Sequence, residues 1–182
     1  QAVEAGEAIE RGLKRREAEG HDVSRMGPVV TIMVGRLDDW LKHVVERDGL
    51  DVAPEALEWA GVACLKKAYG IFQERGLRAR LLSAAFRNTL HWSEFVGGDV
   101  VVSPPFKWQE KINASDLDGS PRMDVPVKQE YLDELNKIED FRRAYDEDGM
   151  TVEEFDTFGP TRKTLHQFLQ ADADLDSLVR NV

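Results

Sequence analysis

Cysteine is almost absent from this chain of 182 residues, in which Cys64 stands alone. A single thiol can form neither an internal disulfide nor a cysteine-based metal site. No apolar run approaches the roughly 20 residues that cross a bilayer, and residues 1–5 show neither the basic nor the apolar segment of a secretion signal. We therefore expect a cytoplasmic protein without membrane contact, whose sequence begins at an interior point of a longer protein.

Positive charge is also in deficit. The chain has 24 Lys and Arg residues against 34 Asp and Glu residues, which gives a formal net charge of −10. Nucleic-acid-binding surfaces and anionic membranes require the opposite balance, because Lys and Arg side chains must neutralise phosphates. The charge therefore argues against both partners. The hydrophobic fraction of 42% is ordinary for a globular domain, so the chain can fill a core.

Three short segments are apolar on both faces, a pattern typical of buried parallel strands, and they span residues 29–34, 77–86 and 100–102. Apolar residues spaced by three and four predict helices at residues 2–18, 38–47, 54–75, 89–95, 106–112 and 129–145, and from Pro160 onward. The strands and helices alternate, which predicts parallel strands joined by right-handed crossovers. The strand–helix units fall at about 29–75, 77–95 and 99–113, followed by C-terminal helices over about 129–182.

Three buried strands make a poor sheet by themselves, because a parallel sheet needs cover on both faces and partners at both edges. We therefore predict an α/β fold in which residues 1–182 form the C-terminal half of a (β/α)8 barrel. The earlier strands of that barrel lie elsewhere. Open edges also predict association, either with complementary N-terminal strands or with copies of this chain.

Two arginines follow the first two predicted strands. Arg36 comes after the first strand and Arg87 after the second. Because parallel strands present their carboxyl ends at one edge, where α/β folds bind ligands, we expect both guanidinium groups to face one pocket and share an anion. Alternation along the second strand places Ser83, Ala85 and Arg87 on one face, where small residues leave room for a ligand.

Three segments resemble the last three strands, six to eight, of the transaldolases: VGRLDDW at 34–40, AAFRN at 84–88 and GDVVVSP at 98–104. Residues 141–143, 146–150 and 163–168 resemble the C-terminal helices of that family. In transaldolases a (β/α)8 barrel carries a lysine that forms a Schiff base with a ketose phosphate. A dihydroxyacetone unit then passes to an aldose phosphate, a transfer in the pentose phosphate pathway.

The resemblance implies roles for three residues. Arg36 and Arg87 would bind the phosphate of the sugar phosphate substrate, and Thr31 would line the sugar site. No cofactor and no metal are implied. Two positions depart from the family: Ala85 replaces a serine, which removes a hydroxyl donor to the phosphate, and Met33 replaces an aromatic residue, which changes the pocket wall. The exact sugar therefore stays open.

The Schiff-base lysine and the acid–base carboxylates of the family belong to strands that precede residue 1, so no catalytic residue is assigned within this chain. The resemblance thus implies one part of a transferase, which supplies the phosphate site. The alternative is a non-catalytic module that retains a partial barrel and binds a sugar phosphate or a protein. The loss of the family's serine at Ala85 favours that alternative.

Other residues have simpler interpretations. Arg36 could pair with a neighbouring carboxylate, Asp38 or Asp39. Lys107 follows the third strand, but an exposed lysine at a helix start is far commoner than a nucleophilic one. The four histidines lack the spacing of metal ligands, so each is expected to be a surface residue or a hydrogen-bonded polar one; they are His21, His43, His91 and His166.

Overall fold

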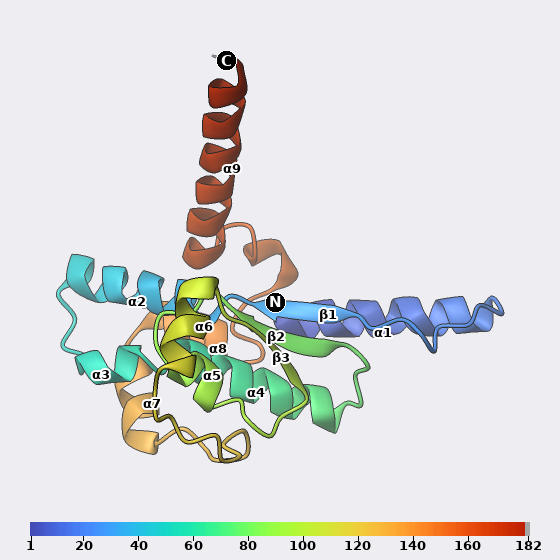
Figure 1. Ribbon diagram of the computed structural model, residues 1–182, viewed down its shortest axis with the longest axis horizontal. Helices are drawn as coiled ribbons and strands as arrows, with labels where there is room; N and C mark the ends of the chain where they lie inside the picture. Colours follow the sequence, from blue (N-terminus) through green and yellow to red (C-terminus); the bar gives the residue numbers. More distant parts are fainter. Residues whose placement is uncertain (181–182) are drawn as a thin grey trace.

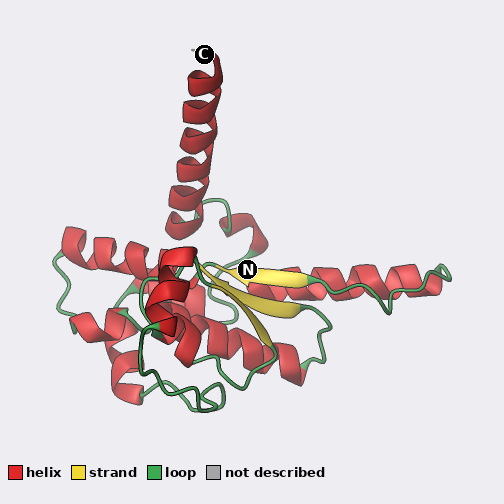
Figure 2. Ribbon diagram, in the orientation of Figure 1, coloured by secondary structure: helices red, strands yellow, loops and turns green. Residues whose placement is uncertain are grey.

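The computed structural model describes residues 1–180 and contains a three-stranded parallel sheet (Figures 1 and 2). The strands are β1 (Val29–Ile32), β2 (Arg80–Ala84) and β3 (Val100–Ser103), and they lie in the order β1-β2-β3. Val30 pairs with Leu81, which pairs in turn with Val100. The prediction of three parallel strands is confirmed, and an α/β fold with it.

Helices precede, connect and follow the strands. They are α1 (Ala2–Ala18), α2 (Val34–Asp48), α3 (Pro54–Leu57), α4 (Ala60–Glu74), α5 (Leu90–Ser93), α6 (Phe106–Asn113), α7 (Gln129–Leu135), α8 (Glu139–Tyr145), the 3-10 turn η1 (Val152–Glu154) and α9 (Gly159–Arg180). Helix α1 has the bounds that its periodicity predicts. No helix within residues 1–180 is long and apolar enough to cross a bilayer.

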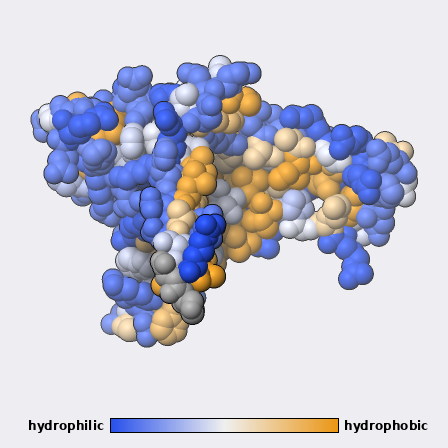
Figure 3. All heavy atoms as spheres, turned by 90° about the horizontal axis from the view of Figure 1, so that it is seen from above, coloured by the Kyte–Doolittle hydropathy of each residue, from blue (hydrophilic) through white to orange (hydrophobic). Residues whose placement is uncertain are grey.

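One face of the sheet is covered and the other is open. On the covered face, Val30 and Leu81 pack in one core with Leu65 and Phe72 of α4. On the opposite face, Thr31 of β1 is exposed and Leu82 of β2 is only half-buried. Within the described chain, β1 and β3 each pair with β2 alone. Figure 3 shows hydrophobic side chains gathered where the sheet lies.

A second core lies on the other side of α4. It joins α2, α3, α4, α7 and α8, and its buried members include Leu37, Leu41, Val44, Leu57, Ala60, Leu135, Ile138 and Phe141. Phe158 enters this core just before α9 begins. The rest of α9 projects from the body (Figure 1), and its apolar residues beyond the first turn are exposed: Leu165, Phe168, Leu169, Leu175, Leu178 and Val179.

Several predicted boundaries are wrong, and tertiary packing explains them. The first strand ends at Ile32, because Val34 already begins α2 four residues before the predicted helix start. The second strand spans 80–84 instead of 77–86. The helix predicted at 129–145 breaks into α7 and α8, since Ile138 is extended and fully buried in the second core.

The helix predicted at 54–75 likewise divides into α3 and α4 at residues 58–59. The last helix begins at Gly159, one residue before the predicted start. Residues 181 and 182 of the predicted C-terminal segment lie outside the described residues.

Candidate functional site

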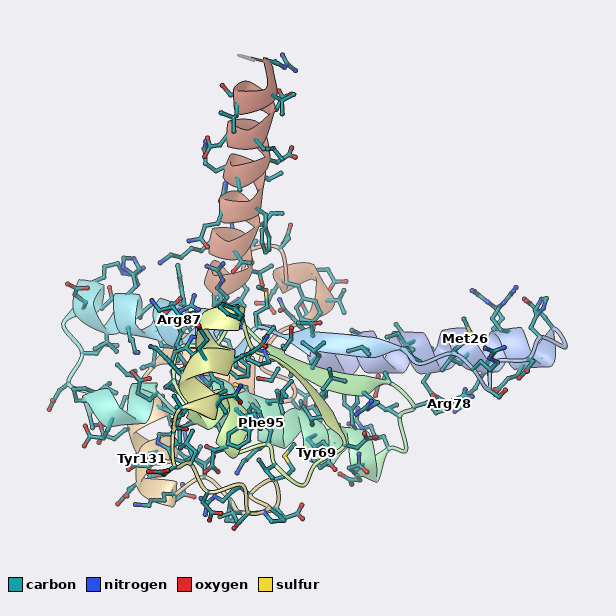
Figure 4. All side chains as sticks on the ribbon, viewed as in Figure 1. Met26, Tyr69, Arg78, Arg87, Phe95 and Tyr131 are labelled. Carbon is teal, nitrogen blue, oxygen red and sulfur yellow. The ribbon has the colours of Figure 1, made fainter. Side chains whose placement is uncertain are left out.

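Arg36 and Arg87, which the sequence predicts to bind an anion, lie at the same end of the sheet, beyond the carboxyl ends of β1 and β2. Figure 4 shows Arg87 at this end, and Arg36 belongs to the first turn of α2. Gly35 lies so close to the second strand that a Cβ atom there would overlap the carbonyl oxygen of Ala85 and come within 2.6 Å of Cγ of Arg87. The first turn of α2 therefore rests directly on the Arg87 side chain.

The Arg87 guanidinium is held by several acceptors. Its Nε donates to both carboxylate oxygens of Asp39, at 3.0 and 2.8 Å, and its Nη2 lies 2.7 Å from Oδ2 of the same residue. Its Nη1 donates to the carbonyl oxygens of Ala85 and Phe86. The carboxylate considered as a partner for Arg36 thus pairs with Arg87 instead, and the guanidinium has a defined orientation.

The chain turns sharply between the second strand and Arg87. Ala85 has a φ of 61°, in the left-handed region that costs a residue with a Cβ about 1–2 kcal/mol. This turn ends the alternation of side chains. Ser83 lies within β2 on the covered face with Leu81, where its hydroxyl donates to the His91 carbonyl oxygen at 3.1 Å. Arg87 lies beyond the turn and is partly exposed. The prediction that Ser83, Ala85 and Arg87 share one face is wrong.

A cavity of about 170 Å³ adjoins Arg36, between α2 and the start of α9, and it is lined by Arg36, Asp39, Pro160, Lys163, Thr164 and Gln167. Arg36 donates through Nη1 to the side-chain oxygen of Gln167, and its Nε is buried without a partner among the described residues. Lys163 adds a second cation, whose Nζ lies 5.8 Å from the centre of the Trp40 ring. Two cations around a small cavity suit an anionic ligand.

The start of α9 is firmly attached beside this cavity. A Cβ atom at Gly159 would overlap the Trp40 ring, and Phe158 and Pro160 are buried. Lys163 is therefore carried by a fixed helical turn. The sequence marked residues 163–168 only as part of a helix, and nothing local indicated that Lys163 and Gln167 would reach Arg36.

A buried hydrogen-bond network lies beneath Arg87. Asp38 and His91 are both fully buried. Oδ1 of Asp38 accepts from the Gly61 amide at 2.8 Å, and its Oδ2 lies 2.8 Å from Nε2 of His91. Nδ1 of His91 accepts from the Arg87 amide at 3.0 Å. Burial raises the pKa of Asp38, and the hydrogen bond from His91 opposes that rise.

The expectation that His91 is a hydrogen-bonded polar residue is confirmed, although sequence alone did not connect it to Arg87. Thr31 lies on the open face of β1 and is exposed. Lys107 lies exposed in the first turn of α6. Within residues 1–180, no three His, Cys, Asp or Glu side chains gather as a metal site requires.

The chain is similar to known transaldolases. The transaldolase of Prochlorococcus marinus subsp. pastoris is 28% identical over 126 residues, which are 69% of this chain and 36% of that protein. The transaldolases of Fusarium oxysporum f. sp. lycopersici and Gibberella intermedia are 26% and 25% identical over 130 residues, 69% of this chain and 38% of each relative. The chain therefore spans little more than a third of the length of these relatives.

No solved structure matches the chain. The profile of the family described as "Transaldolase/Fructose-6-phosphate aldolase" matches residues 1–171, almost the whole sequence. On that match, the chain belongs to the transaldolase/fructose-6-phosphate aldolase family.

Proposed function

We propose that residues 1–182 are the C-terminal part of a transaldolase-type (β/α)8 barrel and supply its phosphate site. The family match and the parallel sheet support this assignment. The form of the sheet supports it further, because one face is packed on α4 while the other carries Thr31 and Leu82, which no helix of residues 1–180 covers. In a barrel that open face would look inward, and β1 would continue the sheet with upstream strands.

The observation that carries the proposal is the placement of Arg36 and Arg87 at one end of the sheet, in contact through Gly35. Barrel enzymes bind substrates at this end. The phosphate of a sugar phosphate would enter the cavity lined by Arg36 and Lys163. Arg87 does not line this cavity itself, but it pairs with Asp39, which does, and would reach the phosphate from there. Thr31 would line the sugar path from the inward face of β1.

The proposed reaction is the transfer of a dihydroxyacetone unit between sugar phosphates. A lysine amine on strands outside residues 1–182 would condense with the ketose carbonyl to form the Schiff base. The arginines described here would hold the phosphate, so that its binding energy orients the carbonyl toward that amine. Their role is binding and orientation.

Borohydride trapping tests this division of labour. Fructose 6-phosphate and borohydride should leave no sugar adduct on the isolated chain but should leave one on a protein that also contains the upstream strands, as seen by intact mass. Trapping on Lys107 of the isolated chain would overturn the assignment. In the longer protein, Arg87→Ala should weaken the binding of phosphorylated substrates far more than that of unphosphorylated ones, because it removes charge-assisted hydrogen bonds to the phosphate.

A second candidate is a non-catalytic sugar-phosphate-binding module. Ala85 favours it, because this position offers no hydroxyl to a phosphate. The same experiment separates the two functions. A module would bind fructose 6-phosphate through Arg87 and would give no covalent adduct even when the upstream strands are present.

A further inference from the structure

We propose that Asp38 and His91 are positioning residues that hold the Arg87 backbone in its phosphate-binding conformation. The inference rests on the proposed function, because it assigns a purpose to the position of Arg87. Neither residue faces the cavity, since both are fully buried. They act on the arginine through the hydrogen bond from its amide to Nδ1 of His91.

Each member of the network comes from a different element. Asp38 belongs to α2, Gly61 to α4 and His91 to α5, while Arg87 lies in the turn after β2. The Phe86 ring packs against the imidazole in a T-shaped arrangement, with ring centroids 5.9 Å apart and ring planes at 81°. The turn that carries Arg87 is therefore linked through His91 of α5 to Asp38 of α2, and through Asp38 to Gly61 of α4.

The hydrogen bonds determine where the imidazole proton lies. The Gly61 amide can only donate, so Oδ1 of Asp38 accepts from it and Oδ2 is left to face Nε2 of His91. The Arg87 amide can likewise only donate, so Nδ1 must be the unprotonated nitrogen. A neutral His91 therefore carries its proton on Nε2, and Asp38 stabilises that tautomer.

Control of the tautomer matters because His91 accepts from the Arg87 amide itself. The other anchors of the turn act through side chains, Arg87 on Asp39 and Asn88 on Glu58. The Nη1 bonds of Arg87 end on the carbonyl oxygens of Ala85 and Phe86, which belong to the same turn and move with it. If Nδ1 carried the proton, two N–H groups would face each other and the turn would shift. The hydrogen bonds of the guanidinium to Asp39 of α2 would then be distorted.

Asp38→Asn is the decisive variant, because it preserves shape while exchanging an acceptor for a donor. The new side-chain amide would keep its oxygen on the Gly61 amide and direct its NH₂ group at Nε2, which forces the proton onto Nδ1. We expect nitrogen-15 NMR to show Nε2–H in the unaltered chain and Nδ1–H in the variant. Titrated with inorganic phosphate, the variant should bind about five- to tenfold more weakly, the effect of losing roughly one hydrogen bond.

Two substitutions of His91 test its two hydrogen bonds separately. His91→Asn places an amide oxygen near the position of Nδ1 and keeps an acceptor for Arg87, whereas His91→Gln places its amide near Nε2 and keeps the contact with Asp38. Both should lower stability. Only His91→Gln should weaken phosphate binding to the extent of Asp38→Asn, and this pair decides the question if Asp38→Asn does not fold.

Glu94→Gln is the matched control for stability. Glu94 is also a buried carboxylate, but it accepts from Lys66 at 2.7 Å and from Arg122 at 3.0 Å and does not contact Arg87. Its replacement by the isosteric amide should lower the unfolding temperature and leave the phosphate affinity of the folded chain unchanged. A core pair with only a structural role would give the same result for Asp38→Asn.

The outcomes separate this inference from the proposed function. If Arg87→Ala abolishes phosphate binding while folded Asp38→Asn binds as the unaltered chain does, the positioning role is wrong and the phosphate site stands. Equal affinities for His91→Asn and His91→Gln, or an Nδ1–H tautomer in the unaltered chain, also overturn the positioning role. If Arg87→Ala binds phosphate normally, the proposed phosphate site itself is wrong.

Discussion

Oδ2 of Asp39 lies 2.7 Å from Nη2 of Arg87, and Asp39 also lines the cavity beside Arg36, one helical turn away. A carboxylate thus stands inside the proposed phosphate site, tied to one of its arginines. It cannot itself bind an anion. Its charge opposes an incoming phosphate, while its hydrogen bonds orient the guanidinium.

Asp39→Asn tests whether repulsion of the phosphate or orientation of Arg87 has the larger effect on phosphate affinity. The ion pair is about one-third exposed, and such pairs are worth at most about 1 kcal/mol to stability, so the variant should fold. The variant removes the repulsion between the Asp39 carboxylate and a doubly charged phosphate, while Arg87 keeps its hydrogen bonds to the carbonyl oxygens of Ala85 and Phe86. We therefore expect phosphate affinity to rise about fivefold at low salt. Calorimetric titration measures it, and the gain should shrink as salt increases.

The control for Asp39→Asn is Asp48→Asn, which removes the same charge from the far end of α2, where Asp48 pairs with Arg47 at 2.6 Å. This change should leave phosphate affinity almost unaltered. Weaker binding by Asp39→Asn would mean that orientation of Arg87 outweighs repulsion. Asp39 would then be a positioning residue of the site.

Gly35→Ala should be severely destabilising. The added methyl group would overlap the Ala85 carbonyl oxygen and crowd Cγ of Arg87, and the first of these is backbone that cannot rotate away. Overpacking at a rigid contact costs about 1–3 kcal/mol or more. Urea denaturation should therefore show a lower free energy of unfolding, and any folded fraction should bind phosphate weakly.

Gly12→Ala is the matched control for that substitution. Gly12 lies within α1, and a Cβ atom there would meet nothing within 4 Å. Because alanine favours the helix over glycine by about 1 kcal/mol, this variant should be slightly more stable than the unaltered chain. Equal stability of the two alanine variants would contradict the close approach of α2 to Ala85.

The hydrogen-bonded pair of Glu10 and Arg78 should make the free energy of unfolding depend on pH. Hydrogen bonds from the Arg78 guanidinium, from Nε and Nη2 at 3.0 Å each, hold the pKa of Glu10 below its ordinary value of 4.5. Its contribution to stability is therefore present above about pH 4.5 and is lost as the pH falls through the lowered pKa. This contact attaches α1 to the segment just before β2.

We expect Glu10→Gln to reduce the dependence of the free energy of unfolding on pH, measured by urea denaturation between about pH 3 and pH 7. Arg78→Gln should also remove the contribution of Glu10 to this pH dependence, because it removes the partner that lowers the pKa of Glu10. The double variant should therefore lose no more of this contribution than either single variant. An unaltered slope in Glu10→Gln would show that the pair does not hold α1 in solution.

Local patterns predicted the elements well where the determining contacts are local. The bounds of α1 follow from a spacing of three and four residues, and the parallel strands follow from apolar runs separated by helices. The placement of Arg36 and Arg87 at one end of the sheet follows from strand direction. Each of these inferences needs only neighbouring residues and the rule that parallel strands share an orientation.

The missed features depend on contacts between distant residues. Asp38 and His91 are 53 positions apart, and Arg36 and Gln167 are 131 apart. Ala85 adopts a conformation that its residue type disfavours, so its own identity gave no sign of the turn. Tertiary packing imposes that turn, and it separates Arg87 from the face of Ser83.

The last prediction concerns the open face of the sheet. Val29 on β1 is 42% exposed, next to an edge that pairs with no other strand within the described residues. An exposed apolar side chain beside an unpaired strand edge favours pairing with another chain. We therefore expect the isolated chain to scatter light as a species heavier than its monomer mass of 20.6 kDa, or to bind a fragment that carries the upstream strands.

Val29→Lys should move the scattering mass toward 20.6 kDa, because a charge on an edge strand opposes strand pairing and cannot be buried against a second sheet. Leu175→Lys is the control, since Leu175 is 59% exposed on the projecting part of α9. If Leu175→Lys dissociates the assembly and Val29→Lys does not, the apolar stripe of α9 carries the association. An unaltered chain that runs as a monomer would instead mean that the sheet tolerates its open face without a partner.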